Sequence, residues 1–156
     1  MLPCYQTIMD AYRPLLEESV PPLSAMANLS ALLWSYLPDL NWAGFYLRKG
    51  DTLYLGPFQG KIACQTIRLG RGVCGTAALT QSVQRVEDVH AFPGHIACDA
   101  ASRSEIVLPL MHSGQVVGVL DLDSPLPARF TEADAEGLQA LCDRLMADVS
   151  WEHGIL

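Results

Sequence analysis

The residues of this chain that could carry chemistry are three cysteines in its central part and three acids that follow them. The cysteines are Cys64, Cys74 and Cys98, and the acids are Glu105, Asp121 and Asp123. A cysteine thiolate is a nucleophile that can form a disulfide with a second thiol. A crowded carboxylate can hold a proton or bind an ammonium group. These residue types together indicate thiol redox chemistry assisted by acids.

The cysteines and the two aspartates also have structural explanations. A free cysteine in an apolar neighbourhood is more often a small core residue than a nucleophile. Asp121 and Asp123 are two residues apart in an expected strand, so their side chains point to one face. That face could border a cavity, or the strand end at Asp123 could be solvated and open a turn.

Trp42 and Tyr46 present the same choice on another expected strand. They share one face with Gly44 between them. Large aromatic side chains most often fill a core, but they also form flat apolar walls for small ligands. The sequence leaves both alternatives open.

Two weaker patterns point to bound ions. A metal ion could be bound by His90, His95 and Cys98. Their spacing matches no zinc motif, however, so we expect no metal site. Gly70-Arg71-Gly72 with Gly75 lacks both a dinucleotide-binding register and a Walker lysine. We therefore interpret these glycines as a tight turn into a helix over residues 73–79.

Composition narrows the class of protein. The chain has 156 residues, with 17 acidic against 10 basic side chains and a net charge of −7, which disfavours binding to nucleic acid or to an anionic membrane. No apolar run approaches the roughly 20 residues of a membrane-spanning helix, and the first ten residues lack a secretion signal, so we expect a cytoplasmic protein. Five cysteines, an odd number, argue against a structural disulfide framework.

Hydrophobic periodicity predicts helices, then antiparallel strands, then a helix. The first helix spans residues 5–16 and is kinked or divided by Pro14; the second spans 24–37 after a Ser24 cap. Strands are expected over 41–47 and 52–55 as a hairpin, and over 83–86, 105–112 and 115–123. Pro109 should lie at a sheet edge or at a bulge. A helix begins after Thr131 with Asp134 in a capping box, and the long loop 90–104 is a candidate functional loop.

This order of elements predicts one α+β domain over residues 1–156, with helices packed on an antiparallel sheet. Several segments then resemble a known family, and they occur in the order of that family from about residue 24 to the end. They are Asn41-Trp42-Ala43-Gly44-Phe45-Tyr46, Gly56 to Cys64, Gly72-Val73-Cys74-Gly75, Phe92 to Asp99, Ser104-Glu105-Ile106-Val107 and Gly118 to Pro125. These segments resemble the free methionine-R-sulfoxide reductases, which are GAF-domain enzymes. The resemblance implies a single GAF-like domain.

The resemblance also implies roles for individual residues. Cys98 would be the nucleophile, Cys64 would resolve it by forming a disulfide, and Cys74 would be a third cysteine able to join the exchange. Glu105, Asp121 and Asp123 match the acidic pocket of the family, and Trp42 and Tyr46 match its aromatic wall. Cys4 and Cys142 lie on expected helices outside the matched segments. The implied reaction reduces free L-methionine (R)-S-oxide to L-methionine with no cofactor except an external dithiol, for which the family expectation is thioredoxin.

The chemistry of a free amino acid fits this implication. Its ammonium group could be bound by the buried acids, and its carboxylate by backbone amides of the loop 95–98. Such a pocket would reject methionine sulfoxide within a polypeptide, where both charges are lost. Two alternatives remain: a non-catalytic GAF sensor of a small ligand, and a thiol redox switch using Cys64 and Cys98. By analogy with other GAF proteins a homodimer is also considered.

Overall fold

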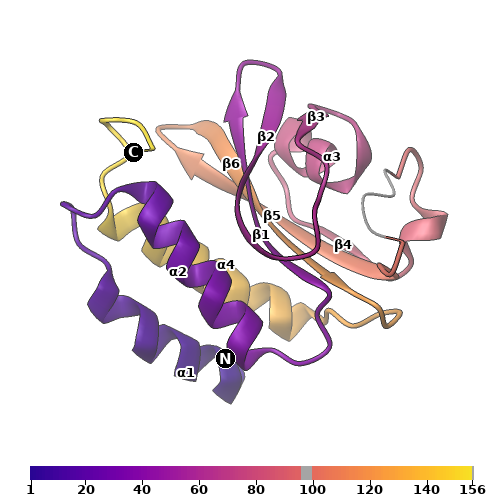
Figure 1. Cartoon of the computed structure of the whole chain (residues 1–156), viewed down its shortest axis with the longest axis horizontal. Coiled ribbons are helices and arrows are strands. Elements are labelled where there is room, and N and C mark those ends of the chain that lie inside the picture. The colour runs from indigo at the N-terminus through magenta and orange to yellow at the C-terminus, as the bar shows by residue number, and fades with distance from the viewer. Residues whose placement is uncertain (96–99, 156) are drawn as a thin grey trace.

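A six-stranded antiparallel sheet with helices on both faces organises the chain (Figure 1). The computed structural model describes residues 1–95 and 100–155. The strand order is β3-β2-β1-β6-β5-β4. The strands are β1 (Trp42–Lys49), β2 (Thr52–Gly60), β3 (Thr66–Arg68), β4 (Gln84–Val86), β5 (Ser104–His112) and β6 (Gln115–Ser124). The α-helices are α1 (Pro3–Tyr12), α2 (Pro22–Tyr36), α3 (Gly72–Thr80) and α4 (Glu132–Asp148).

One face of the sheet is covered by α2 and α4, with α1 packed against these two helices, and this side holds the larger core (Figure 1). Alternate residues of the central strands point into it, including Ala43 and Phe45 of β1 and Leu120 and Leu122 of β6. Burial of this continuous apolar layer is the main stabilising contribution to the fold.

The opposite face of the same strands carries the residues in between. Trp42 and Tyr46 of β1, Val107 of β5 and Val119 of β6 pack there in a second, smaller core beneath α3. Asp121 and Asp123 lie on this face too, because a strand turns alternate side chains to opposite sides. The expectation that each of these pairs shares one face is confirmed.

The N-terminal helices differ from the sequence predictions at their ends. The first is divided as expected: α1 ends at Tyr12 and a 3₁₀ turn follows over Arg13–Leu15. The expected Ser24 cap of the second helix is wrong. That helix starts at Pro22, where a proline's missing N–H costs nothing at the first helical position.

The strand predictions were mostly right but incomplete. The hairpin forms, although β2 continues to Gly60, and the short edge strand β3 was not predicted. Pro109 lies on β5 beyond the residues that pair with β4, and the register against β6 shifts between Leu110 and Met111. Pro109 is therefore next to a bulge, on a stretch where one side of β5 has no paired neighbour among the described residues.

The C-terminal helix begins with the predicted capping box. Thr131 accepts a hydrogen bond from the Asp134 backbone N–H, and the Asp134 carboxylate accepts one from the Thr131 backbone N–H. Tyr5 of α1 donates to the same carboxylate at 2.6 Å, which joins the two ends of the chain. Within residues 1–95 and 100–155, no helix combines the length and the apolar character that crossing a membrane requires.

Candidate active site

A pocket with about 520 Å³ of empty space, part of it open to solvent, lies on the α3 side of the sheet. Strands β1, β5 and β6 form its floor, and α3 with two irregular segments forms its walls. The lining residues are Trp42, Tyr46, Ile62, Ala63, Ile67, Arg71, Gly72, Val73, Cys74, His95, Ser102, Glu105, Asp121 and Asp123.

Strand register brings the three predicted acids together. Asp123 lies between Trp42 on β1 and Glu105 on β5, and Asp121 lies two residues further along β6. Glu105, Asp121 and Asp123 are 6%, 5% and 8% exposed. Three acids of one small apolar surface are thus almost withdrawn from water, which is costly unless they hold protons or meet a cation.

Burial and crowding favour protons on this cluster. Burial raises the pKa of Glu105 well above its usual value, and the neighbouring Asp121 carboxylate raises it further. Burial likewise raises the pKa of Asp121, with the Asp123 carboxylate as the next cause. These raised pKa values favour the protonated carboxyls of the pair, whereas a cation bound beside them would favour loss of a proton.

Cys74 closes the floor of the pocket from the first turn of α3. Its sulfur lies 3.9 Å from Glu105 Oε2, and the residue is 4% exposed. Burial raises the pKa of the Cys74 thiol, and the carboxylates of Asp121 and Glu105 raise it further. Cys74 is therefore a protonated thiol in the empty pocket rather than a ready nucleophile.

An aromatic wall borders the acids. The rings of Trp42 and Phe58 stack with centroids 5.2 Å apart, and those of Trp42 and Tyr46 with centroids 5.8 Å apart. The Tyr46 hydroxyl donates to the backbone carbonyl of Cys64 at 2.9 Å. Gly44 makes this wall possible, since a Cβ there would lie 2.3 Å from Cβ of Phe58 on the facing strand.

Two buried polar atoms of the pocket have no hydrogen-bond partner among the described residues: the Trp42 indole Nε1 and the Asp121 Oδ1. One is a donor and the other an acceptor. Buried polar groups are nearly always paired in folded proteins, so an unpaired donor and acceptor in one pocket indicate a polar ligand with complementary groups.

The chain matches the GAF domain model over residues 8–149. The free methionine-R-sulfoxide reductase of Escherichia coli is 63% identical over 123 residues, which cover 79% of this chain and 74% of that protein. A structure of fRMsr of Staphylococcus aureus in complex with substrate has a TM-score of 0.88 at 42% identity, covering 94% of this chain and 95% of that one. The chain belongs to the GAF-domain free methionine-R-sulfoxide reductase family. Another member's structure, from Neisseria meningitidis in complex with its substrate, has a TM-score of 0.87 at 41% identity and covers 91% and 86% of the two chains.

The five cysteines of this family member fall into different environments. Cys4 and Cys142 lie on α1 and α4, as predicted, and are free, as is Cys74. Cys64 follows β2 in an irregular segment at the pocket and is disulfide-bonded. Cys98, predicted as the nucleophile, lies outside the described residues. So do three of the four residues whose backbone amides were expected to bind a carboxylate.

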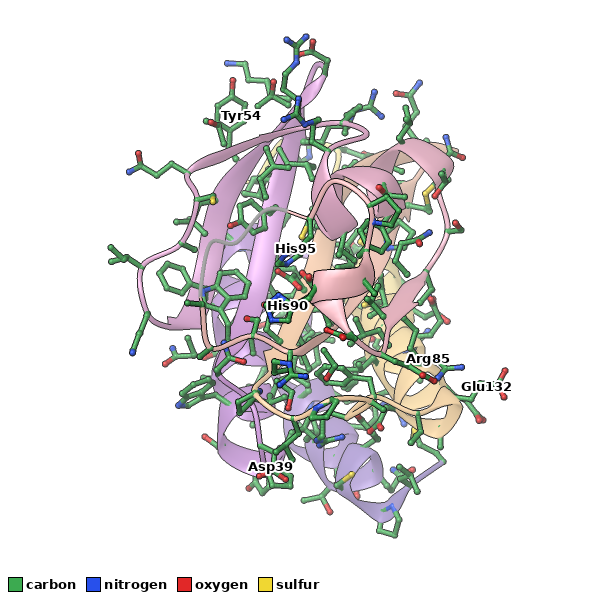
Figure 2. All side chains as sticks on the ribbon, turned by 90° about the vertical axis from the view of Figure 1, so that its right-hand side faces the viewer. Asp39, Tyr54, Arg85, His90, His95 and Glu132 are labelled. Atoms are coloured by element: carbon green, nitrogen blue, oxygen red, sulfur yellow. The ribbon has the colours of Figure 1, made fainter. Side chains whose placement is uncertain are left out.

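Three polar side chains of the pocket were not predicted to bind substrate. Arg71 lies just before α3 and lines the pocket, although in the sequence it is only one of several scattered arginines. Ser102 is buried and accepts a hydrogen bond from the Asn41 side-chain amide at 3.0 Å. His95 borders the opening, and burial followed by the nearby His90 lowers its pKa, so its imidazole is neutral. Both histidines lie near the centre of the face seen in Figure 2.

The only grouping of candidate metal ligands found in residues 1–95 and 100–155 is Cys74, Glu105 and Asp121. One ligand atom from each lies within 4.8 Å of the others. Neither His90 nor His95 belongs to it, and Cys98, the third residue of that weak sequence pattern, lies outside the described residues. The same thiol and carboxylates equally suit an ammonium group, which needs acceptors rather than a fixed coordination geometry.

Proposed function

We propose that this chain reduces free L-methionine (R)-S-oxide to L-methionine, using its own cysteine thiols and an external dithiol. The observation that carries the proposal is the pocket's unpaired pair of atoms, Asp121 Oδ1 and Trp42 Nε1, beside three buried acids. The relatives named free methionine-R-sulfoxide reductase or fRMsr, including two structures in complex with substrate, support the proposal.

The acids account for recognition of the ammonium group. Asp121 Oδ1 accepts one hydrogen bond from it, and the oxygens of Glu105 and Asp123 surround it with negative charge. An ammonium group has three donors and needs this number of acceptors once it leaves water. Because a carboxyl proton must leave when the cation enters, binding should strengthen as pH rises through the lower of the raised pKa values of Glu105 and Asp121.

Arg71 accounts for the opposite end of a free amino acid. It is a pocket residue with no ion pair among the described residues, so its guanidinium is available for the substrate carboxylate. A peptide-bound methionine sulfoxide lacks both the ammonium and the carboxylate. The pocket would then hold unpaired buried acids, which disfavours such a substrate strongly.

The aromatic wall suits the remaining part of the substrate. The methyl and methylene groups next to the sulfur are apolar and would lie against the Trp42 and Tyr46 rings. The Trp42 Nε1–H, which has no described partner, can donate to an oxygen of the substrate.

The redox steps are assigned by resemblance to the family. The Cys98 sulfur attacks the sulfoxide sulfur, the oxygen passes to Cys98 as a sulfenic acid, and the thioether of methionine leaves; the thiol hydrogen balances the new S–OH group. Cys64 then attacks the sulfenic acid sulfur, forming a disulfide and releasing water. An acid of the cluster that keeps its proton beside the bound substrate assists departure of the sulfoxide oxygen. An external dithiol, of which thioredoxin is the expected protein class, restores both thiols.

Cys74 is best assigned to the pocket floor. Its thiol is buried against Glu105, and a protonated thiol exchanges slowly with a disulfide. We therefore place it beside the substrate ammonium, whose charge would offset that of the acids.

The decisive experiment measures methionine formed from free methionine-R-sulfoxide, from the S epimer and from a blocked peptide analogue, each with a dithiol. We expect turnover of the first substrate alone. Cys98→Ser should abolish it, and Cys64→Ser should form about one methionine per enzyme when no external thiol is present. Wild-type turnover by Cys98→Ser would refute the mechanism, and binding of the sulfoxide without any methionine would favour a sensor.

A further inference from the structure

The segment that carries Cys64 is an irregular loop at the rim of the pocket. Residues 61–65 connect β2 to β3 without regular structure, and Ile62 within it is 89% exposed. The loop ends are held by the sheet, where Gly60 pairs with Trp42 and Thr66 pairs with Tyr54. Between those ends, Cys64 is disulfide-bonded in this structure, and its backbone is held by further contacts of the loop.

One such contact comes from the floor of the pocket. The hydroxyl of Tyr46 donates to the backbone carbonyl of Cys64 at 2.9 Å. A second hydrogen bond, from the Leu55 backbone N–H to the Gln65 carbonyl at 3.0 Å, fixes the following residue. Backbone atoms of the redox loop are thus tied to two neighbouring strands.

The side chain of Tyr46 is held in one position by its neighbours. It lies in the middle of β1, paired with Leu55 on one side and Val119 on the other, and it is 2% exposed. Its ring stacks on Trp42, which leaves the hydroxyl little freedom. Burial raises the pKa of Tyr46, and the charge of Asp121 raises it further, so the phenol keeps its proton and remains a donor at every pH at which the protein is used.

We propose that the Tyr46 hydroxyl is a positioning group that holds the Cys64 loop in the geometry needed for disulfide closure. The proposal rests on the proposed function, since it concerns the second of its two chemical steps. In that step the Cys64 sulfur attacks the sulfenic acid sulfur, the new S–S bond replaces the S–O bond, and the departing hydroxide takes the thiol proton to form water.

Disulfide closure is sensitive to the position of the attacking thiol. An intramolecular reaction gains its rate from holding the reacting atoms close to contact distance in the correct orientation. A loop released at Cys64 samples other positions, so the sulfenic acid lives longer before it is resolved. Reduction of the sulfoxide precedes this step and does not use Cys64.

The test is Tyr46→Phe, which keeps the ring and its stacking but removes the hydroxyl. In single-turnover experiments without external thiol, methionine formation reports the first step, and labelling with a sulfenic-acid-specific reagent such as dimedone reports the second. We expect the second step to slow roughly two- to tenfold relative to the first, the effect of one neutral hydrogen bond. Slowing of both steps by the same factor, or of neither, would overturn the proposal.

Two controls separate positioning from general damage. Tyr54→Phe makes the same change on the adjacent strand β2, where the side chain is 44% exposed and lies at the periphery of the molecule in Figure 2; it should leave both steps unchanged. In a Cys64→Ser background, Tyr46→Phe should add nothing to the lifetime of the sulfenic acid, because there is no attacking thiol to position. An added effect in that background would refute positioning of Cys64.

The same experiments distinguish failure of this proposal from failure of the proposed function. If the wild-type chain forms no methionine from the free sulfoxide, the function itself is wrong. If it forms methionine and resolves its sulfenic acid at the same rate with and without the Tyr46 hydroxyl, only the positioning role is wrong.

Discussion

Replacing Asp121 by Asn should weaken catalysis while flattening the dependence of stability on pH. Asp121 is 5% exposed, its Oδ1 has no described hydrogen-bond partner, and burial with the Asp123 carboxylate raises its pKa. A residue kept for stability would be expected to have both carboxyl oxygens paired. A nearly buried acid with one oxygen left unpaired is instead expected where a ligand supplies the partner.

The kinetic magnitude follows from the hydrogen bond that the substrate ammonium would lose. A hydrogen bond to a charged group in a desolvated site contributes about 1.5–3 kcal/mol, so kcat/KM for free methionine-R-sulfoxide should fall roughly ten- to a hundredfold in Asp121→Asn. A purely ammonium-binding role predicts this as a raised KM, and a proton-donor role predicts it mainly as a lower kcat.

The stability change has a definite sign. An acid whose pKa is raised on folding contributes stability that is present below its unfolded pKa and is lost as pH rises through its folded pKa. Each unit of such a shift corresponds to about 1.4 kcal/mol. Asn cannot ionise, so the variant should lose less stability than the wild type between acidic and alkaline pH. Glu105 and Asp121 interact, so their titrations are coupled in the wild type. The pH dependence of stability that remains in the variant comes from Glu105 and its neighbours.

The assays are steady-state kinetics and thermal unfolding over a series of pH values. Asp134→Asn is the matched control, because Asp134 is also 4% exposed but is fully paired outside the pocket. Burial alone would raise its pKa, yet hydrogen bonds from the Thr131 backbone and Tyr5 outweigh burial and lower it. Its contribution is present above the unfolded pKa and is lost as pH falls through the folded one.

The two aspartates should therefore give opposite results. Asp134→Asn should lose about 1.5–3 kcal/mol of stability at neutral pH and retain kcat/KM. If Asp121→Asn keeps kcat/KM within about twofold of wild type, less than half a kcal/mol, the ammonium site is wrong. If its stability follows the wild-type pH profile, the assignment of a raised pKa is wrong.

Further substitutions test other parts of the site and the cysteines outside it. Arg71→Ala should raise KM for the free amino acid sulfoxide at least about fivefold with little change in kcat, and Arg71→Lys should restore part of the loss; an unchanged KM would remove Arg71 from substrate binding. Gly44→Ala should lower both unfolding temperature and kcat/KM, because its Cβ would meet Phe58 at 2.3 Å and push β2 away from the Trp42 wall; wild-type values of both would contradict this geometry. Cys142→Ser should lower stability by about 1–3 kcal/mol through a buried hydroxyl while Cys142→Ala costs less, and neither should alter turnover per folded molecule, as for Cys4→Ser; a selective kinetic loss would show that these thiols take part.

Local patterns in the sequence were sufficient for most of the elements. Pro14 accounted for the division of the first helix, and the spacing of Thr131 and Asp134 accounted for the capping box. Both features depend on residues within one helical turn. The start of α2 was placed two residues late, because a proline at the first helical position was passed over for a serine that forms no cap. The strand β3 was not predicted because a run of three residues is too short for alternation to indicate a strand.

The same distinction between local sequence pattern and tertiary packing applies to the site. Strand alternation by itself determined that Asp121 and Asp123 point one way and that Trp42 and Tyr46 share a face, because that period is a property of the extended backbone. Whether the aspartates met water or a pocket was undecided until antiparallel register set Asp123 between Trp42 and Glu105, and α3 covered them with Cys74. The hydrogen bond between Tyr46 and Cys64 likewise joins residues on separate elements. Arg71 lines the same pocket from the segment before α3, apart from the strands that carry the acids. Only tertiary packing could decide them, since contacts between distant segments leave no periodic trace in a single sequence.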